Sequence, residues 1–489
     1  MKKLLQLSTK EFFYGVSAGE YYDAGGIFHP NTIGVSPAYP RDPATVGLLC
    51  PGGLPVNRGS TVVVDSVLAG ITNSTGGATT LYSVGSSGHF YSHNLATPDG
   101  TPTDLRSATP ITGATNGLAT FQPVGGTRYL YYWQQTQIGR WNLSGSYPTG
   151  WTDNWKVSGD GVQSTYIRPV HQFLDRVYYG NGDRIGMISD AGGGVEAHNG
   201  NVLDFPTNLK VHSITDDGYY LVIALTEQSV SGQPSSYPVS KVVFWDTVSS
   251  SWAKEYSFTE SPGLMSSRSI GGIIYAIDTQ NLWAFSFSSS PQKVNLGYNS
   301  RAGSFTPDSS GHANHQQLQV YGDGVMWLNR ANGLSYYGKL INTASRAVHN
   351  FIGAMTSPTS VLPIADTRFY VGGASKYYSI SPFGGDDTGA IARTVYLPLG
   401  VTYQIKKIRL VFGEKLESGD VVKVDIQRDV NEAEYTTGTW GIASYTLHGA
   451  APYVDLYSTT EVEHLKLILS FTGGTVRIKR IEVWGDQIL

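Results

Sequence analysis

Two histidines, His312 and His315, stand three residues apart and are candidate ligands for a metal ion. On a helix this spacing would let both imidazoles bind one zinc ion. Here the pair follows Ser309-Ser310-Gly311, a sequence typical of a loop. We therefore interpret it as a solvated loop and expect no metal site.

Other residues that could carry chemistry are few. The chain has no His-Glu-x-x-His zinc motif and no EF-hand loop. Its single cysteine, Cys50, cannot form an internal disulfide and has no basic neighbour in sequence that would stabilise a thiolate. We expect no cofactor and no catalytic residue, and we predict that the protein is not an enzyme.

Three arginines, Arg128, Arg176 and Arg368, stand just before predicted β hairpins and could together bind a carboxylate. Because they occupy equivalent positions, a repeated structural role is the better interpretation. Two pairs of carboxylates, Asp216-Asp217 and Asp386-Asp387, lie beside glycines and are most simply turn residues.

The 31 tyrosines and 10 tryptophans could stack against sugars, since their rings offer flat apolar faces. Most of them fall inside predicted strands, which favours a role in the core.

A recurring pattern organises these residues. A hydrophobic run, a polar or glycine-rich turn and a second run ending in aromatics occur about seven times. The first runs contain Leu81, Leu130, Val177, Leu221, Ile274, Met326 and Tyr370, at steps of 49, 47, 44, 53, 52 and 44 residues. Repeats of this length that carry β hairpins indicate a β-propeller. Seven copies predict about seven blades, and the preceding leader could complete an extra blade or close the ring with a shared one.

The chain divides into three parts on this reading. Residues 1–75 form an irregular leader with one strand signal at Thr61-Val62-Val63-Val64, and residues 76–390 form the propeller. In residues 391–489 apolar and polar residues alternate with period two, which predicts a small antiparallel β-sandwich, jelly-roll-like in outline. The chain is thus expected to be all-β.

Two strands of the C-terminal part are rich in basic residues. They contain Lys406, Lys407 and Arg409, and Arg477, Lys479 and Arg480. Acidic residues of the same part balance them, with 12 Asp and Glu against 11 Lys and Arg. A solvated sheet face is the first interpretation and a partner-docking face the second.

Composition restricts the class of protein. Charged residues make up 15% of the chain and the formal net charge is −4, which argues against a general nucleic-acid binder. Low charge also suits a surface largely covered by neighbouring subunits. The start, Met1-Lys2-Lys3-Leu4-Leu5, begins like a signal peptide, but polar residues soon interrupt it. No apolar run approaches the length of a membrane span, so we expect synthesis in a cytoplasm without classical export.

The whole plan resembles the tail hub or nozzle proteins of tailed bacteriophages. The C-terminal part carries the more specific resemblance, in Lys406-Lys407-Ile408-Arg409-Leu410, Asp425-Ile426-Gln427-Arg428-Asp429, Leu465-Lys466-Leu467 and the closing Ile481-Glu482-Val483-Trp484-Gly485. That ending is also similar to the last strand of discoidin-like carbohydrate-binding modules.

The resemblance implies a structural protein of the virion tail, made in the host cytoplasm. Subunits of this kind form a ring, most often a hexamer, that lines the channel for genome ejection. They dock fibres, an adaptor or collar, and other tail parts, while DNA passes without sequence-specific binding. A ring needs heterologous contacts between two different faces of each subunit, and the leader and the small β domain are candidates for these faces.

Two other functions stay open. A carbohydrate-binding propeller could act as a tail-tip adhesin, which exposed aromatics in a groove would support. A glycoside hydrolase would need two carboxyl groups about 5–9 Å apart in a cleft, and the sequence contains no recognisable pair.

Overall fold

The computed structural model describes residues 2–7, 35–36, 50–51 and 56–58, most of 62–380, and the strands within 391–488. In these residues nearly all regular structure is β-strand, apart from one short 3-10 helix, η2 (Ser158–Asp160). The expected all-β class is confirmed.

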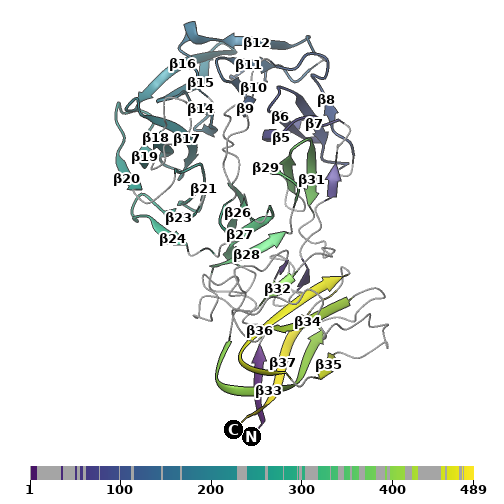
Figure 1. The fold of residues 1–489 in the computed structure, drawn as a ribbon. Helices are drawn as coiled ribbons and strands as arrows, with labels where there is room; N and C mark the ends of the chain where they lie inside the picture. The colour runs from purple at the N-terminus through teal and green to yellow at the C-terminus, as the bar shows by residue number, and fades with distance from the viewer. Residues whose placement is uncertain are drawn as a thin grey trace.

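Seven four-stranded antiparallel sheets form the blades of a propeller (Figure 1). The strands of each blade are called a to d from the centre outward. In order of blade they are β5 (Val67–Thr75), β6 (Ala78–Gly85), β7 (Phe90–Asn94) and β8 (Thr103–Asp104); β9 (Thr115–Phe121), β10 (Tyr129–Gln134), β11 (Ile138–Trp141) and β12 (Trp151–Lys156); β13 (Val170–Phe173), β14 (Arg176–Gly180), β15 (Arg184–Gly192) and β16 (Val195–Asp204); β17 (Leu209–Asp216), β18 (Leu221–Glu227), β19 (Ser240–Trp245) and β20 (Lys254–Phe258); β21 (Ser266–Ile270), β22 (Ile273–Ile277), β23 (Leu282–Phe285) and β24 (Gln292–Val294); β25 (Leu318–Tyr321), β26 (Gly324–Leu328), β27 (Leu334–Lys339) and β28 (Arg346–Ile352); β29 (Pro358–Leu362), β30 (Phe369–Gly373), β31 (Lys376–Ile380) and β4 (Val56–Arg58). The seven sequence repeats are the b and c strands, so the predicted blade number is confirmed.

The ring closes through the last of these strands. β4 comes from the N-terminal stretch, yet it pairs with β31 as strand d of blade 7, with Tyr378 opposite Asn57. The leader therefore closes the ring through a shared blade, which is one of the two roles that the sequence left open.

Hydrophobic clusters lie at each of the seven junctions between neighbouring blades. Aromatic side chains dominate them, and Trp133, Trp245 and Trp327 are almost completely buried. The interpretation of the strand aromatics as core is confirmed for these side chains. Their large apolar area makes each junction a main source of stability.

The strand expected at Thr61-Val62-Val63-Val64 is wrong, because its described residues, 62–64, are irregular and strand a of blade 1 begins at Val67. The reason lies at Asp65, whose carboxylate accepts hydrogen bonds from the Tyr91 hydroxyl (2.6 Å) and the Ser87 backbone N–H (2.8 Å). Its carbonyl accepts another from the Ser375 N–H. The segment thus bridges blades 7 and 1 instead of pairing as a strand.

The C-terminal strands form a sheet of seven strands that folds over one core. They are β32 (Ile391–Arg393), β33 (Leu397–Phe412), β34 (Val421–Gln427), β35 (Tyr453–Tyr457), β36 (Glu461–Thr472), β37 (Ile478–Gln487) and β1 (Lys2–Leu7). Long, irregularly registered β33 pairs with β35, β36 and β37 and so joins the parts of the sheet.

The first strand of the chain belongs to this domain. β1 pairs with β37 from Lys2 opposite Asp486 to Leu7 opposite Ile481, and the two termini lie side by side in Figure 1. The description of the leader as irregular is therefore wrong for residues 2–7. β37 would otherwise present an open hydrogen-bonding edge, which β1 covers.

Among the residues that the structure describes, no helix is long and apolar enough to cross a membrane.

Glycines beneath tyrosine rings are a repeated packing device in blades 2 and 3. Gly139 faces Tyr132 across β10 and β11, and Gly186 faces Tyr179 across β14 and β15. A Cβ on Gly139 would lie 2.2 Å from the Tyr132 ring. That ring cannot move freely, because its hydroxyl donates a hydrogen bond to Asp153 (2.5 Å).

We predict that Gly139→Ala lowers the free energy of unfolding by about 1–3 kcal/mol, the usual cost of overpacking. Urea unfolding measures it. The matched control is Gly159→Ala, where nothing lies within 4 Å of the new Cβ. Equal stability of the two variants would contradict this account of the tyrosine–glycine pair.

Candidate functional site: an interblade pocket and two exposed surfaces

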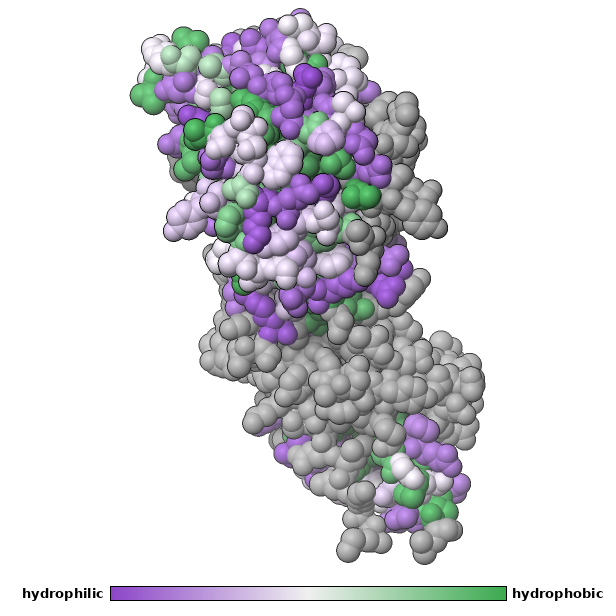
Figure 2. Space-filling model, turned by 90° about the vertical axis from the view of Figure 1, so that its left-hand side faces the viewer, coloured by the Kyte–Doolittle hydropathy of each residue, from purple (hydrophilic) through white to green (hydrophobic). Residues whose placement is uncertain are grey.

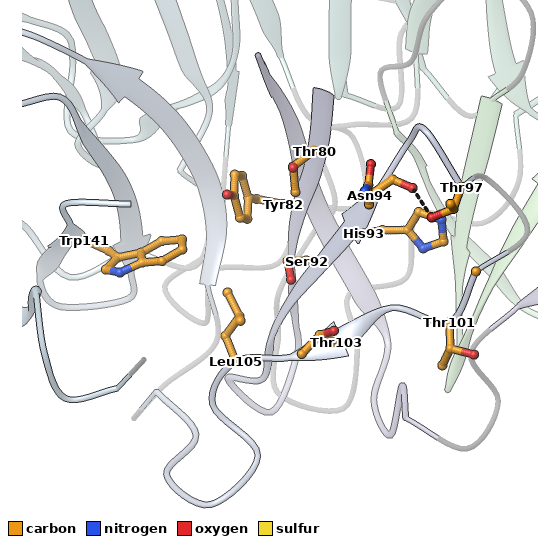
Figure 3. Close-up of a pocket in the computed structure, with 11 residues that line it drawn as sticks. Thr80, Tyr82, Ser92, His93, Asn94, Thr97, Thr101, Thr103, Leu105 and Trp141 are labelled. Carbon is orange, nitrogen blue, oxygen red and sulfur yellow. Dashed lines mark hydrogen bonds between the residues drawn. The ribbon is translucent and has the colours of Figure 1, made fainter. Parts of the chain in front are cut away.

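A pocket of about 330 Å³ lies where blade 1 faces blade 2 (Figure 3). Cross-strand pairing places its side chains on one face of blade 1, because Tyr82 is opposite Ser92 and Thr80 is opposite Asn94. Thr103 of β8 pairs with Ser92 and extends this row.

The pocket has an apolar end and a hydroxyl-rich end. In Figure 3, Tyr82, Leu105 and Trp141 lie at one end, and Asn94, Thr97 and Thr101 lie at the other. The remaining lining residues are Thr80, Ser92, His93, Gly100 and Thr103. None of the lining residues is an acid, a lysine or an arginine.

The apolar end is rigid. The Trp141 ring is stacked on Trp151 with centroids 4.8 Å apart and contacts Tyr82 edge-on at 5.5 Å. Its indole N–H donates to the Ser144 carbonyl (3.2 Å). Burial raises the pKa of Tyr82, so its hydroxyl stays protonated at neutral pH.

An ion pair between the buried Arg106 and the partly exposed Asp153 lies beside this end. Arg106, next to Leu105, donates two hydrogen bonds of 2.9 Å to Asp153, and its guanidinium lies 3.8 Å from the centre of the Tyr147 ring. Burial raises the pKa of Asp153, but the hydrogen bonds from Arg106 and Tyr132 outweigh it and the net pKa is lowered.

Among the described lining residues, uncharged hydrogen-bonding groups predominate. Within the described part of the chain, no group of three or more His, Cys, Asp or Glu is placed to hold a metal ion. The pocket offers neutral donors and acceptors beside an aromatic surface, which is a recognition chemistry.

A second feature is the face of the propeller that carries the a–b and c–d turns, here called the turn face. Since the strands of each blade alternate in direction, these two kinds of turn lie on the same side of the ring. Seven large apolar side chains at or beside these turns are exposed: Val124, Leu174, Val195, Tyr219, Val248, Ile273 and Val320. Only Val64 and Val239 among the described propeller residues expose large apolar side chains elsewhere. Figure 2 shows apolar side chains interspersed with hydrophilic ones along the side of the propeller that it presents.

Backbone conformation sets two of these turns apart. Leu174 has φ of 48° and is 62% exposed, and Thr247, with φ of 65°, precedes Val248, which is 86% exposed. Positive φ is uncommon for a bulky or β-branched residue. Neither burial nor backbone preference explains a leucine at position 174, where Asn or Gly would be favoured.

The third feature is the outer face of the C-terminal sheet. Lys407 lies 3.7 Å from the centre of the Trp484 ring, and Arg409 lies 3.9 Å from the centre of the Tyr453 ring. Arg409 also makes hydrogen bonds of 2.6 and 2.8 Å to Asp455. Aromatic and arginine side chains on an open sheet are typical of interaction hot spots.

The basic residues that the sequence singled out in this domain have mixed roles. Lys407 and Arg409 belong to the aromatic face just described. Lys406 donates a hydrogen bond to Gln404, and Arg480 forms an ion pair of 2.6 Å with Glu482.

The arginines considered for carboxylate binding are not brought together. Arg128 and Arg176 stand at the a–b turns of different blades, and Arg128 donates to Thr120 of its own blade (3.3 Å). Arg368 lies outside the described residues.

The Asp216-Asp217 pair holds a turn, as predicted. Asp216 accepts the Gly218 N–H and Asp217 accepts those of Tyr219 and Tyr220. Asp216 has a further partner in His171, 2.6 Å away on the neighbouring blade, and this hydrogen bond lowers its pKa.

Other candidates cannot be placed. His312, His315, Asp386 and Asp387 lie outside the described residues, and Cys50 is described only as part of the short strand pair β2 (Val35–Ser36) and β3 (Cys50–Pro51).

Two short segments match catalytic motifs in spacing. Gly333 to Lys339 has the spacing of a phosphate loop, but Leu334–Lys339 form the extended strand β27 and not a loop. A Gly-x-Ser-x-Gly match at residues 15–19 lies outside the described residues.

Sequence reasoning missed the pocket and the turn face. Hydroxyl residues are common throughout this chain, and those of the pocket come from three strands and a loop. The sequence did contain one indication of the turn face. Leu174 and Asp175 form a two-residue turn, and Leu-Asp is a poor sequence for a hairpin turn.

No protein-family model and no curated protein sequence matches the chain. Several solved structures match at low identity. One is BBS1N in a complex with ARL6DN (10% identity, TM-score 0.44, covering 68% of this chain and 96% of that one). Another is the Pan2 WD40 domain of Neurospora crassa (10%, 0.41, 65% and 90%), and a third is the extracellular domain of BT4673 from B. thetaiotaomicron (11%, 0.39, 72% and 42%). Likeness at this level says nothing about function.

The ion pair behind the pocket gives a pH-dependent prediction. Because the pKa of Asp153 is lowered in the folded protein, its stabilising effect is present above its unfolded pKa of about 3.9 and is lost as the pH falls through the folded value. We expect Arg106→Gln to cost roughly 2 kcal/mol at pH 7 and clearly less at pH 3.

Urea unfolding at the two pH values tests this. Lys241→Gln, which removes a partly exposed ion pair with Glu255 (2.6 Å), is the control. It should cost less than about 1 kcal/mol, because the Lys241 side chain is 31% exposed whereas that of Arg106 is 1% exposed. An Arg106→Gln cost that is unchanged at pH 3 would contradict the role of Asp153.

Proposed function

We propose that this chain is a structural subunit of a bacteriophage tail, a hub or nozzle that assembles into a closed ring. The ring, most simply a hexamer, surrounds the path of genome ejection and docks fibres, a collar or other tail parts. The site of action is the virion tail, after synthesis in the host cytoplasm. No catalysis is assigned to it.

One observation carries the proposal: the concentration of exposed apolar side chains on the turn face. A monomer would gain from polar residues at these turns, and at Leu174 it also bears a backbone conformation that costs of order 1 kcal/mol or more. Apolar side chains at exposed turns, and a leucine at positive φ, are best explained by contact with another protein surface.

The C-terminal domain supplies a second, different surface. Its outer face carries Lys407, Arg409, Tyr453 and Trp484, with Tyr457 75% exposed beside them. A ring requires that two unlike faces of each copy meet, and the turn face and this sheet face are unlike. The plan of a propeller followed by a β domain, which resembles tail hubs and nozzles, supports the same function.

The formal net charge of −4 suits a channel wall. DNA that must leave quickly is hindered by basic surfaces, since each phosphate contact adds affinity. A weakly acidic protein lets DNA pass without holding it.

We expect Leu174→Asn to separate stability from assembly. Asn accepts positive φ more readily than Leu, so the isolated subunit should gain roughly 0.5–1 kcal/mol in the free energy of unfolding. The same change should weaken self-association, measured by sedimentation equilibrium. A variant that is less stable and assembles normally would contradict the assignment of Leu174 to an interface.

Tyr219→Ala tests the turn face at its most exposed aromatic residue, which is 84% exposed. Tyrosine is a frequent hot-spot residue, and its loss should weaken assembly at least about tenfold. Val239→Ala is the matched control, because Val239 is also exposed (40%) but lies before strand c of blade 4, away from the turn face. If both variants assemble like the parent chain, the turn face is not the contact.

A further inference from the structure

We propose that the pocket between blades 1 and 2 is a binding site for a neutral saccharide. This site is independent of the ring contacts, since none of the exposed turn-face residues lines it. The ligand is defined below by charge, shape and hydrogen bonding.

Charge excludes ionic ligands first. The eleven lining residues that the structure describes include no acid, lysine or arginine, and the titratable side chains among them are those of Tyr82 and His93. The imidazole of His93 is engaged, with Nε2 3.0 Å from the Tyr370 hydroxyl and the two rings 5.0 Å apart. A phosphate, sulfate or carboxylate would enter without a compensating cation, which is costly. The ligand is therefore neutral.

Hydrogen-bonding capacity then favours a polyhydroxylated ligand. The lining carries hydroxyls of Thr80, Ser92, Thr97, Thr101 and Thr103 and the side-chain amide of Asn94, groups that donate and accept hydrogen bonds. Some are partly engaged already: Thr97 donates to the Asn94 carbonyl (3.4 Å), and the Asn94 amide oxygen accepts the Ala96 N–H (2.9 Å), which leaves its NH₂ group as donor. Asn94, Thr97, Thr101 and Thr103 are exposed and remain accessible from solvent. Sugar hydroxyls have the same dual character, whereas an apolar ligand would leave this end unpaired.

The apolar end completes the match. Tyr82 and Trp141 present rigid aromatic surface, and Leu105 adds an aliphatic side chain. A pyranose ring carries C–H groups on one face and hydroxyls around its edge, so it can contact the rings while its edge meets the threonines. The volume of about 330 Å³ is near the lower limit for ligand pockets and suits one or two sugar rings.

Saturation-transfer-difference NMR on the full chain tests the proposal. The probes are the methyl glycosides of glucose, galactose, mannose and N-acetylglucosamine, with N-acetylneuraminic acid as the anionic comparison. We expect at least one neutral glycoside to show transfer and the anionic sugar to show none. Dextran and a neutral galactan, added as polymers, separate recognition of a free sugar from recognition of a polysaccharide; binding of either kind supports the site.

Variants at exposed lining positions are used so that a loss of binding is not confused with a loss of folding. Asn94→Ala removes hydrogen bonds, and Thr103→Trp fills the pocket; each should weaken binding at least tenfold in titrations. Tyr219→Ala, outside the pocket, should bind like the parent chain. The proposal is overturned if no neutral saccharide binds at millimolar concentration, if the anionic sugar binds equally well, or if the two pocket variants bind unchanged. Assembly is measured in separate experiments, so a negative result in the saccharide experiments would not contradict the proposed ring.

Discussion

Closure of the ring is the constraint on which the rest of this structure depends. Seven blades pack through seven aromatic-rich clusters, and each cluster exists only if both of its blades are in place. β4 fixes the last blade by pairing with β31, and Asp65 ties blade 7 to blade 1 through Tyr91 and Ser375. Joining the ends of the repeat in this way makes the propeller rigid, and the turn face and the pocket are both built on it, whereas the second proposed contact surface belongs to the C-terminal sheet.

The sequence predicted the middle of each blade well and its margins poorly. Strands b and c carry the buried aromatics and so show a clear pattern, as in Tyr131-Tyr132-Trp133. β4 and β1 could not be predicted, because their partners lie more than 300 residues away in the chain. The strand predicted at Thr61-Val64 was wrong for a related reason. The position of this segment is set by Asp65 and blade 7, and not by local strand preference.

The candidate sites were predictable only in part. Lys407 and Arg409 were recognised as a possible docking strand, and the structure adds Trp484 and Tyr453, which give that face its aromatic character. The pocket depends on the junction of two blades and on an ion pair, Arg106 and Asp153, whose members are 47 residues apart. Exposure of turn residues cannot be read from composition, although the backbone conformation that Leu174 must adopt follows from a two-residue turn.

Native mass spectrometry of the full chain, over increasing protein concentration, is the most direct test of the central claim that this propeller is a ring-forming subunit. The account predicts a transition from the 52.9 kDa monomer to one closed species of defined copy number, most simply six, without a ladder of longer forms. A chain that stays monomeric up to its solubility limit, or that grows into open-ended polymers, would contradict it.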